Sequence, residues 1–179
     1  MHIPVECYAS AEHFLGGITA PRPGVVVLDI RMPGMSGMEL QQRLATDARF
    51  LPVIMVTGHG DVETSVEAMR RGAFDFLQKP YDAQRLKNLI NTTLGKADEL
   101  WNCWKIHQLV KSRYDSLSVR EREVCNMLIQ GIETRSIATT LGISPSTVEK
   151  HRLRIFEKMT INSVPLLIRE LEKLMPEKT

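Results

Sequence analysis

The segment from Ser144 to Met159 carries two stripes of side chains with opposite character. If it is helical, Val148, Ile155 and Met159 fall on one side and form an apolar, inward-facing stripe. A second stripe, at spacings of three, four, seven and eleven residues, is polar and mostly basic; it consists of Thr147, Lys150, His151, Arg154 and Lys158. Such donors on one helix face can reach base edges and phosphate oxygens in a major groove. We therefore expect these five residues to contact double-stranded DNA.

The competing interpretation of this stripe is an ordinary solvated helix face, and the flanking residues argue against it. Ser144 is a suitable N-cap with Pro145 in the first helical position, and Gly142 ends a shorter helix just before it. Two helices joined by such a tight turn form a helix-turn-helix. His151 remains ambiguous, because it could donate to a phosphate or pack against the preceding helix.

The elements around this motif are all helical. Ser118 and Glu121 form a capping box that opens a helix through about residue 129. Further helices are predicted over 134–141, 144–159 and 163–174. The last one carries an apolar side made of Val164, Leu167, Ile168 and Leu171.

The first half of the chain alternates strand-like and helix-like segments. Strands are predicted over 3–8, 25–28, 53–56 and 74–77, and helices begin after Ser10, after the turn at 32–37 and at Asp61, with Val62, Val66 and Met69 on one face of the last. This alternation predicts a parallel sheet covered by helices, the α/β class. A long helix over 82–113 follows. Its Trp101 and Trp104 either dock on the first domain or pair with a second chain.

Composition limits the remaining classes. The chain has 179 residues and a net charge of +2; residues 1–90 carry 9 basic and 10 acidic residues, and residues 91–179 carry 14 and 11. The three cysteines form no CxxC pair, which fits a reducing cytoplasm better than a disulfide framework or a zinc site. The apolar runs are too short to span a membrane. No catalytic triad, metal cluster or glycine-rich phosphate loop indicates an enzyme.

Two stretches resemble known families. The segment Leu117–Met159, with its Ser118-Val-Arg-Glu121 box, Leu141-Gly-Ile-Ser144 turn and Thr147-Val148 pair, resembles the LuxR/FixJ-type helix-turn-helix. This resemblance implies a four-helix module whose third helix reads DNA and whose last helix can dimerise, so we expect a homodimer on DNA. Residues 25–37, 57–61 and 72–80 resemble a two-component receiver domain of the flavodoxin-like fold.

The receiver resemblance implies a phosphoryl site. Asp29 would be the phosphoacceptor, the hydroxyl of Thr57 and the ammonium of Lys79 would bind the phosphoryl group, and Phe76 would be the switch aromatic. Lys79-Pro80 would be joined by a cis peptide bond. The resemblance also implies Mg²⁺, held by Asp29 and the backbone carbonyl of Arg31, and a sensor histidine kinase as partner.

The chain departs from the receiver pattern at its beginning. It opens where the second strand of a receiver is expected, and neither Glu6 nor Glu12 matches the acidic pair that precedes it in the family. With Asp29 as its remaining carboxylate, the site should bind Mg²⁺ weakly and accept a phosphoryl group slowly or not at all. Without the first strand and helix, the receiver should also be repacked, stabilised by dimer formation, or partly unfolded.

These observations predict three parts and leave three functions open. The parts are a receiver-like domain over 1–95 that lacks its first strand and helix, a helical linker over 96–114, and a LuxR-type domain over 115–179. The first-ranked function is a transcription regulator that binds DNA without phosphorylation. The alternatives are a phosphorylation-switched regulator whose true start lies upstream, and a truncated interaction module that modulates another regulator.

Overall fold

The computed structural model describes residues 3–18, 20–48, 50–58 and 62–174. Its contacts divide the chain into two compact units, Met1–Trp104 (unit 1) and Lys105–Thr179 (unit 2). Across the described ranges, no helix combines the length and apolar character needed to cross a bilayer.

Unit 1 is built on a parallel sheet of three strands in the order β1 (Val26–Asp29), β2 (Val53–Thr57) and β3 (Asp75–Gln78). All five residues of β2 are buried, as expected for the middle strand of a sheet covered on both faces. This position explains why its sequence is continuously apolar up to Thr57 instead of alternating. The prediction of a parallel α/β sheet is confirmed.

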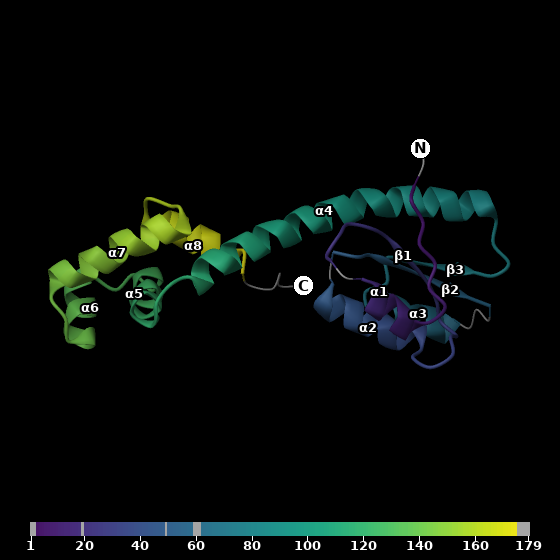
Figure 1. The fold of residues 1–179 in the computed structure, drawn as a ribbon, viewed down its shortest axis with the longest axis horizontal. Helices are drawn as coiled ribbons and strands as arrows, with labels where there is room; N and C mark the ends of the chain where they lie inside the picture. Colours follow the sequence, from purple (N-terminus) through teal and green to yellow (C-terminus); the bar gives the residue numbers. More distant parts are fainter. Residues whose placement is uncertain (1–2, 19, 49, 59–61, 175–179) are drawn as a thin grey trace. The chain divides into compact units, whose positions relative to one another are not determined.

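Helices cover both faces of the sheet. Helices α1 (Ala11–Gly17), α2 (Gly37–Asp47) and α3 (Val62–Arg70) lie on one side, and α4 (Ala83–Asp115) begins on the other (Figure 1). Ser10 caps α1 as predicted, and Ser36 forms a capping box with Glu39 at the start of α2. The N-cap predicted at Asp61 lies outside the described residues.

The prediction of a strand over residues 3–8 is wrong: these residues form no strand. A strand requires a hydrogen-bonded neighbour, and residues 3–8 have no backbone pairing with β1, β2 or β3. Side chains hold the segment instead. Glu6 forms an ion pair with Arg22 and accepts a hydrogen bond of 2.5 Å from the Tyr8 hydroxyl. The Tyr8 ring packs edge-on against Phe14.

The apolar face predicted for α3 does not pack as expected. Val66 and Met69 are exposed to 42% and 47%, whereas Ala68 is fully buried. The amide of Gln41, itself buried in α2, donates a 2.9 Å hydrogen bond to the carbonyl of Ala68. The contact face of α3 is therefore centred on Ala68, which belongs to the buried core of unit 1.

Three aromatic rings attach α4 to unit 1. Trp101 and Trp104 stack at 4.8 Å between centroids with an interplanar angle of 12°, and buried Phe50 packs at 5.1 Å and 4.9 Å from them. Of the two arrangements left open for the tryptophans, the structure thus shows docking on the same chain. The segment 96–114, expected to be a linker, is part of α4, and the boundary between the units falls inside it.

Unit 2 contains the end of α4 and four shorter helices: α5 (Val119–Ile129), α6 (Thr134–Leu141), α7 (Pro145–Met159) and α8 (Val164–Glu172). Their shared core includes Val110 of α4, Leu117, and one stripe from each of the four helices. Gly142 ends α6 with φ of +65°, a left-handed conformation that glycine adopts without strain. The predicted four-helix module is confirmed, with each helix beginning and ending within two residues of its expected bounds.

Gly37 supports a close approach between α2 and β1 that no other residue permits without movement. A Cβ at this position would lie 2.1 Å from the carbonyl oxygen of Asp29. We expect Gly37→Ala to lower the free energy of unfolding of unit 1 by about 1–3 kcal/mol, as for other overpacked sites. A urea titration followed by tryptophan fluorescence measures this directly, because both tryptophans of the chain lie in unit 1.

Gly95→Ala is the matched control for this substitution. Gly95 lies inside α4, and a Cβ there would meet nothing within 4 Å. The change should raise stability by about 0.5–1 kcal/mol, because alanine loses less backbone entropy in a helix. Equal destabilisation by both substitutions would show that the contact with Asp29 is not the cause.

Candidate nucleic-acid interface and phosphoryl site

Local hydrogen bonds fix the position of α7 against α6. The Ser144 hydroxyl accepts a hydrogen bond of 3.2 Å from the Thr147 amide, as an N-cap should. The Thr134 hydroxyl of α6 donates to the Glu149 carboxylate at 2.9 Å. Val148, Ile155 and Met159 are fully buried in the core of unit 2, which confirms the predicted inward stripe. The opposite side of α7 therefore faces solvent.

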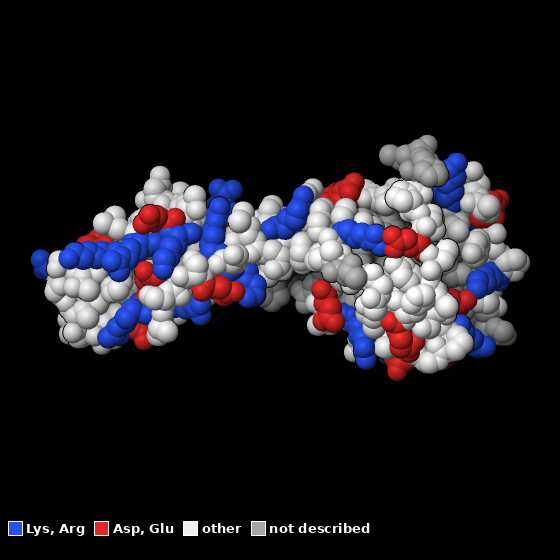
Figure 2. All heavy atoms as spheres, viewed as in Figure 1, with Lys and Arg blue, Asp and Glu red and all other residues white. Residues whose placement is uncertain are grey.

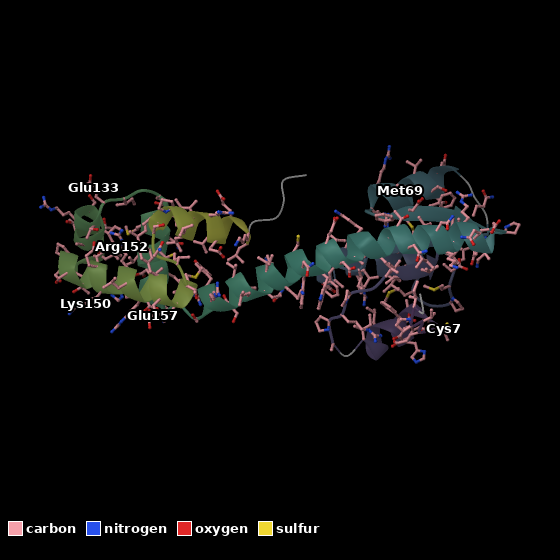
Figure 3. The ribbon with its side chains drawn as sticks, turned by 90° about the horizontal axis from the view of Figure 1, so that it is seen from above. Cys7, Met69, Glu133, Lys150, Arg152 and Glu157 are labelled. Carbon is pink, nitrogen blue, oxygen red and sulfur yellow. The ribbon has the colours of Figure 1, made fainter. Side chains whose placement is uncertain are left out.

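Lys150 and Arg154 lie on this solvent side. Both are exposed, and within the described part of the chain neither side chain makes a hydrogen bond or ion pair. Figure 2 shows Lys and Arg side chains in a row over α7. In Figure 3, Lys150 and Glu157 lie along the free edge of α7, whereas Arg152 lies on the edge toward the other helices. The guanidinium of Arg152 is 5.3 Å from the centre of the Phe156 ring, so this arginine packs within the module.

The other three residues of the predicted stripe are placed differently. Thr147 is half-buried, and its hydroxyl lies 2.8 Å from the Ser144 hydroxyl. His151 is half-buried, and its Nδ1 is buried without a hydrogen-bond partner among the described residues. Lys158 is turned toward α5. Its ammonium lies 2.6 Å from a carboxylate oxygen of Glu121 and donates at 3.0 Å to the carbonyl of Ser116.

The contact between Lys158 and Glu121 is a partly buried ion pair. The Glu121 side chain is 4% exposed and that of Lys158 37%. Burial alone raises the pKa of Glu121, but hydrogen bonds from Lys158 and the Ser118 amide, together with the charge of Lys158, leave this pKa below its ordinary value. Lys158 therefore joins the end of α7 to the start of α5, a role that the stripe on α7 alone did not indicate.

In unit 1, the carboxyl ends of the three strands bring the predicted phosphoryl-site residues to one edge of the sheet. Asp29 ends β1, Thr57 ends β2, and Lys79 follows β3. The Lys79 ammonium lies 2.5 Å from Asp29 Oδ2, and its backbone amide donates to the Thr57 carbonyl at 2.7 Å. Lys79-Pro80 is a cis peptide bond, as the receiver resemblance implies.

Asp29 is thus held by neighbouring donors. Its Oδ1 accepts a 3.1 Å hydrogen bond from the backbone amide of Arg31. Burial raises the pKa of Asp29, but the hydrogen bonds from Lys79 and Arg31 outweigh this effect, so the pKa of Asp29 lies below its ordinary value. The hydrogen bond between Lys79 and Asp29 also raises the pKa of Lys79. Phe76, the expected switch aromatic, lies in β3 and is half-buried.

Glu12 has a role that the sequence did not reveal. Its Oε1 accepts a 2.9 Å hydrogen bond from the Met35 amide, in the loop between β1 and α2, and this bond lowers the pKa of Glu12. The hydrogen bond holds the loop that follows Asp29. Neither Glu6 nor Glu12 joins Asp29 in a group of three metal-binding side chains, and the described ranges contain no such group.

Comparisons with known proteins agree with the folds of unit 1 and unit 2. Residues 1–91 match the model of the response regulator receiver domain, and residues 115–171 match that of the bacterial regulatory proteins of the luxR family. The transcriptional regulatory protein FixJ of Bradyrhizobium diazoefficiens is 39% identical over 165 residues, or 92% of this chain and 80% of FixJ.

Two further relatives match this chain over most of their own length. The response regulator protein TmoT of Ectopseudomonas mendocina is 39% identical over 171 residues, or 95% of this chain and 77% of TmoT. The solved structure of the response regulator StyR matches with a TM-score of 0.66 at 36% identity, covering 93% of this chain and 84% of StyR.

Proposed function

The chain belongs to the two-component response regulators that join a receiver domain to a LuxR-type DNA-binding domain, and we propose that it binds duplex DNA through α7 without requiring a phosphoryl group on Asp29. It is a DNA-binding transcription regulator. The observation that carries DNA binding is the exposed pair Lys150 and Arg154 on the outward side of α7, which makes no hydrogen bond or ion pair with any described residue. We place its action in the cytoplasm, where its DNA partner is found.

Lys150 and Arg154 are the side chains best placed to bind DNA. In the described part of the chain their positive groups form no ion pair, so they remain available to phosphates and to acceptor atoms on base edges. Thr147 sits beside the N-terminus of α7, where a phosphate contact is favoured by the helix dipole. Lys158 contributes through its ion pair with Glu121, which fixes the position of α7, rather than through its own contact with DNA.

The donor set around Asp29 supports the second half of the proposal. Receiver domains commonly bind Mg²⁺, a cation that takes near-octahedral oxygen ligands and one or two protein carboxylates. Here the two oxygens of Asp29 already accept hydrogen bonds from Arg31 and Lys79. With the Arg31 carbonyl as the other candidate ligand, these residues fit Mg²⁺ poorly. An incoming phosphoryl group would meet a carboxylate with little added positive charge beyond Lys79.

A second function, control by phosphorylation, is favoured by the meeting of Asp29, Thr57 and Lys79 at one edge of the sheet. A carboxylate oxygen of Asp29 would attack the phosphorus of a donor, and the donor oxygen would leave with the bonding electrons, giving an acyl phosphate. Lys79 would then pair with the phosphoryl oxygens. The partner implied by this chemistry is a sensor kinase.

We also propose that two copies bind paired half-sites on DNA. Of the apolar side predicted for α8, Leu167 and Leu171 are buried in the core of unit 2 and are not available to a second chain. Leu166 and Ile168 are exposed to 39% and 37% and support a contact between copies. The proposed dimer surface therefore keeps Ile168 of the predicted apolar side and adds Leu166.

Intact mass after incubation with acetyl phosphate and Mg²⁺ tests the proposed independence from phosphorylation. We expect the chain to gain no phosphoryl group under conditions in which its tryptophan fluorescence shows unit 1 to be folded. Asp29→Asn is the control. A gain of one phosphoryl group in the unsubstituted chain, absent from Asp29→Asn, would favour the phosphorylation-switched regulator instead.

A further inference from the structure

Leu153 is an exposed apolar residue on the outward side of α7, beside the proposed DNA-binding pair Lys150 and Arg154. Its exposed fraction is 68%, which is large for a leucine in a helix with a well-formed buried side. It lies one turn after Lys150 and directly before Arg154, and Glu157 follows one turn later. All three of these neighbours are exposed. Leu153 is thus an apolar spot surrounded by charged side chains.

The position of Leu153 around α7 distinguishes it from other exposed apolar residues. At about 100° per residue, Leu153 and Lys150 fall on either side of the direction opposite to buried Val148. Val119, which is 77% exposed, lies on α5 and has no such relation to the basic row. Single exposed leucines are common and by themselves uninformative. A leucine at the centre of the outward face of a recognition helix faces whatever the helix binds.

We propose that Leu153 reads a thymine through the C5-methyl group, which only T presents as an apolar group in the major groove. This inference rests on the proposed binding of duplex DNA by α7. A leucine side chain offers no hydrogen bond to cytosine, guanine or adenine, so its contribution to specificity is burial of the methyl group against its own methyls. Lys150 and Arg154 supply the attraction to the phosphates, and Leu153, beside Lys150 on the outward side of α7, supplies a base preference.

Selection of duplexes from a random library by the full chain, followed by single thymine-to-uracil replacements in the selected duplex, tests this role. Uracil lacks only the C5-methyl group. We expect one replacement to weaken binding of the unsubstituted chain about fourfold, the value for burial of about one methyl-sized group. In Leu153→Ala the same replacement should have no effect. Binding by Leu153→Ala should depend on salt concentration as binding by the unsubstituted chain does, because the substitution removes no phosphate contact.

Val119→Ala is the matched control, since it truncates another strongly exposed apolar residue outside α7 and should keep the discrimination between thymine and uracil. If Leu153→Ala retains the full discrimination between thymine and uracil, the inference is wrong. It is also wrong if Leu153→Ala strengthens binding to every duplex alike, a result that would point to a protein surface that covers Leu153. If the unsubstituted chain selects no sequence at all, sequence-specific binding fails as well, and the two failures are thereby distinguished.

Discussion

Replacing both Lys150 and Arg154 with alanine should weaken binding of the full chain to its selected duplex about 30-fold or more. Each contact with a base or phosphate contributes about 1–3 kcal/mol, and 1.4 kcal/mol corresponds to a factor of ten. Both side chains are exposed and form no hydrogen bond or ion pair with the described residues, so the variant should remain folded. Fluorescence anisotropy with a labelled duplex, repeated over a range of NaCl concentrations, measures the affinity and its dependence on salt.

The salt dependence separates the roles of the two residues. The slope of log affinity against log salt should become shallower by about one for each phosphate contact removed. The control is a variant with Arg169 and Lys173 replaced by alanine. It also removes one lysine and one arginine, but from the end of α8 instead of from α7. Equal weakening by both variants would mean that net charge, rather than the face of α7, determines binding.

Replacing Lys158 with methionine should lower the free energy of unfolding of unit 2 by about 3 kcal/mol at pH 7. Removing one partner of a buried ion pair leaves the other charge without compensation, with losses of about 3–5 kcal/mol. The low end applies because the Lys158 side chain is 37% exposed. Among the described residues, Glu121 would keep its hydrogen bonds with Ser118, the N-cap of α5. Urea unfolding followed by circular dichroism measures the loss, with tryptophan fluorescence reporting separately on unit 1.

The effect of Lys158→Met should also depend on pH. The pKa of Glu121 is lowered in the folded chain, so its ion pair adds stability above the unfolded pKa of about 4.3 and loses it as the pH falls through the folded value. The difference between the two proteins should therefore shrink below about pH 4. Lys111→Met, which breaks an exposed pair with Asp115, should change stability by less than about 1 kcal/mol at any pH. A loss from Lys158→Met that is the same at pH 3 and pH 7 would contradict a role for this charge pair.

Local signals explain what the sequence could predict. Ser118 and Ser144 are caps whose geometry involves neighbours three residues away, and the structure places both as expected. The stripe of Val148, Ile155 and Met159 follows from helical periodicity alone, and all three residues are buried. The chemistry expected at Asp29 required the family resemblance, but its contact with Lys79 follows from the parallel sheet, which brings strand ends to the same edge.

The residues that could not be placed depend on partners distant in the sequence. Periodicity puts Lys158 in one stripe with Lys150 and Arg154, but it does not show that Glu121 of another helix lies within reach. The packing of Phe50 on the two tryptophans depends on where the loop after α2 meets α4. Residues 3–8 have strand-like composition, yet composition cannot provide the neighbouring strand that would pair with them.

The most direct measurement is the affinity of the purified full chain, without any phosphodonor, for the selected duplex and for a scrambled duplex of the same composition at physiological salt. We expect the selected duplex to bind at least about a thousandfold more tightly, as is typical of specific DNA-binding proteins, and acetyl phosphate with Mg²⁺ to leave this ratio unchanged. Equal binding of the two duplexes, or a preference that arises only after the phosphodonor is added and is absent in Asp29→Asn, would contradict phosphorylation-independent recognition through α7.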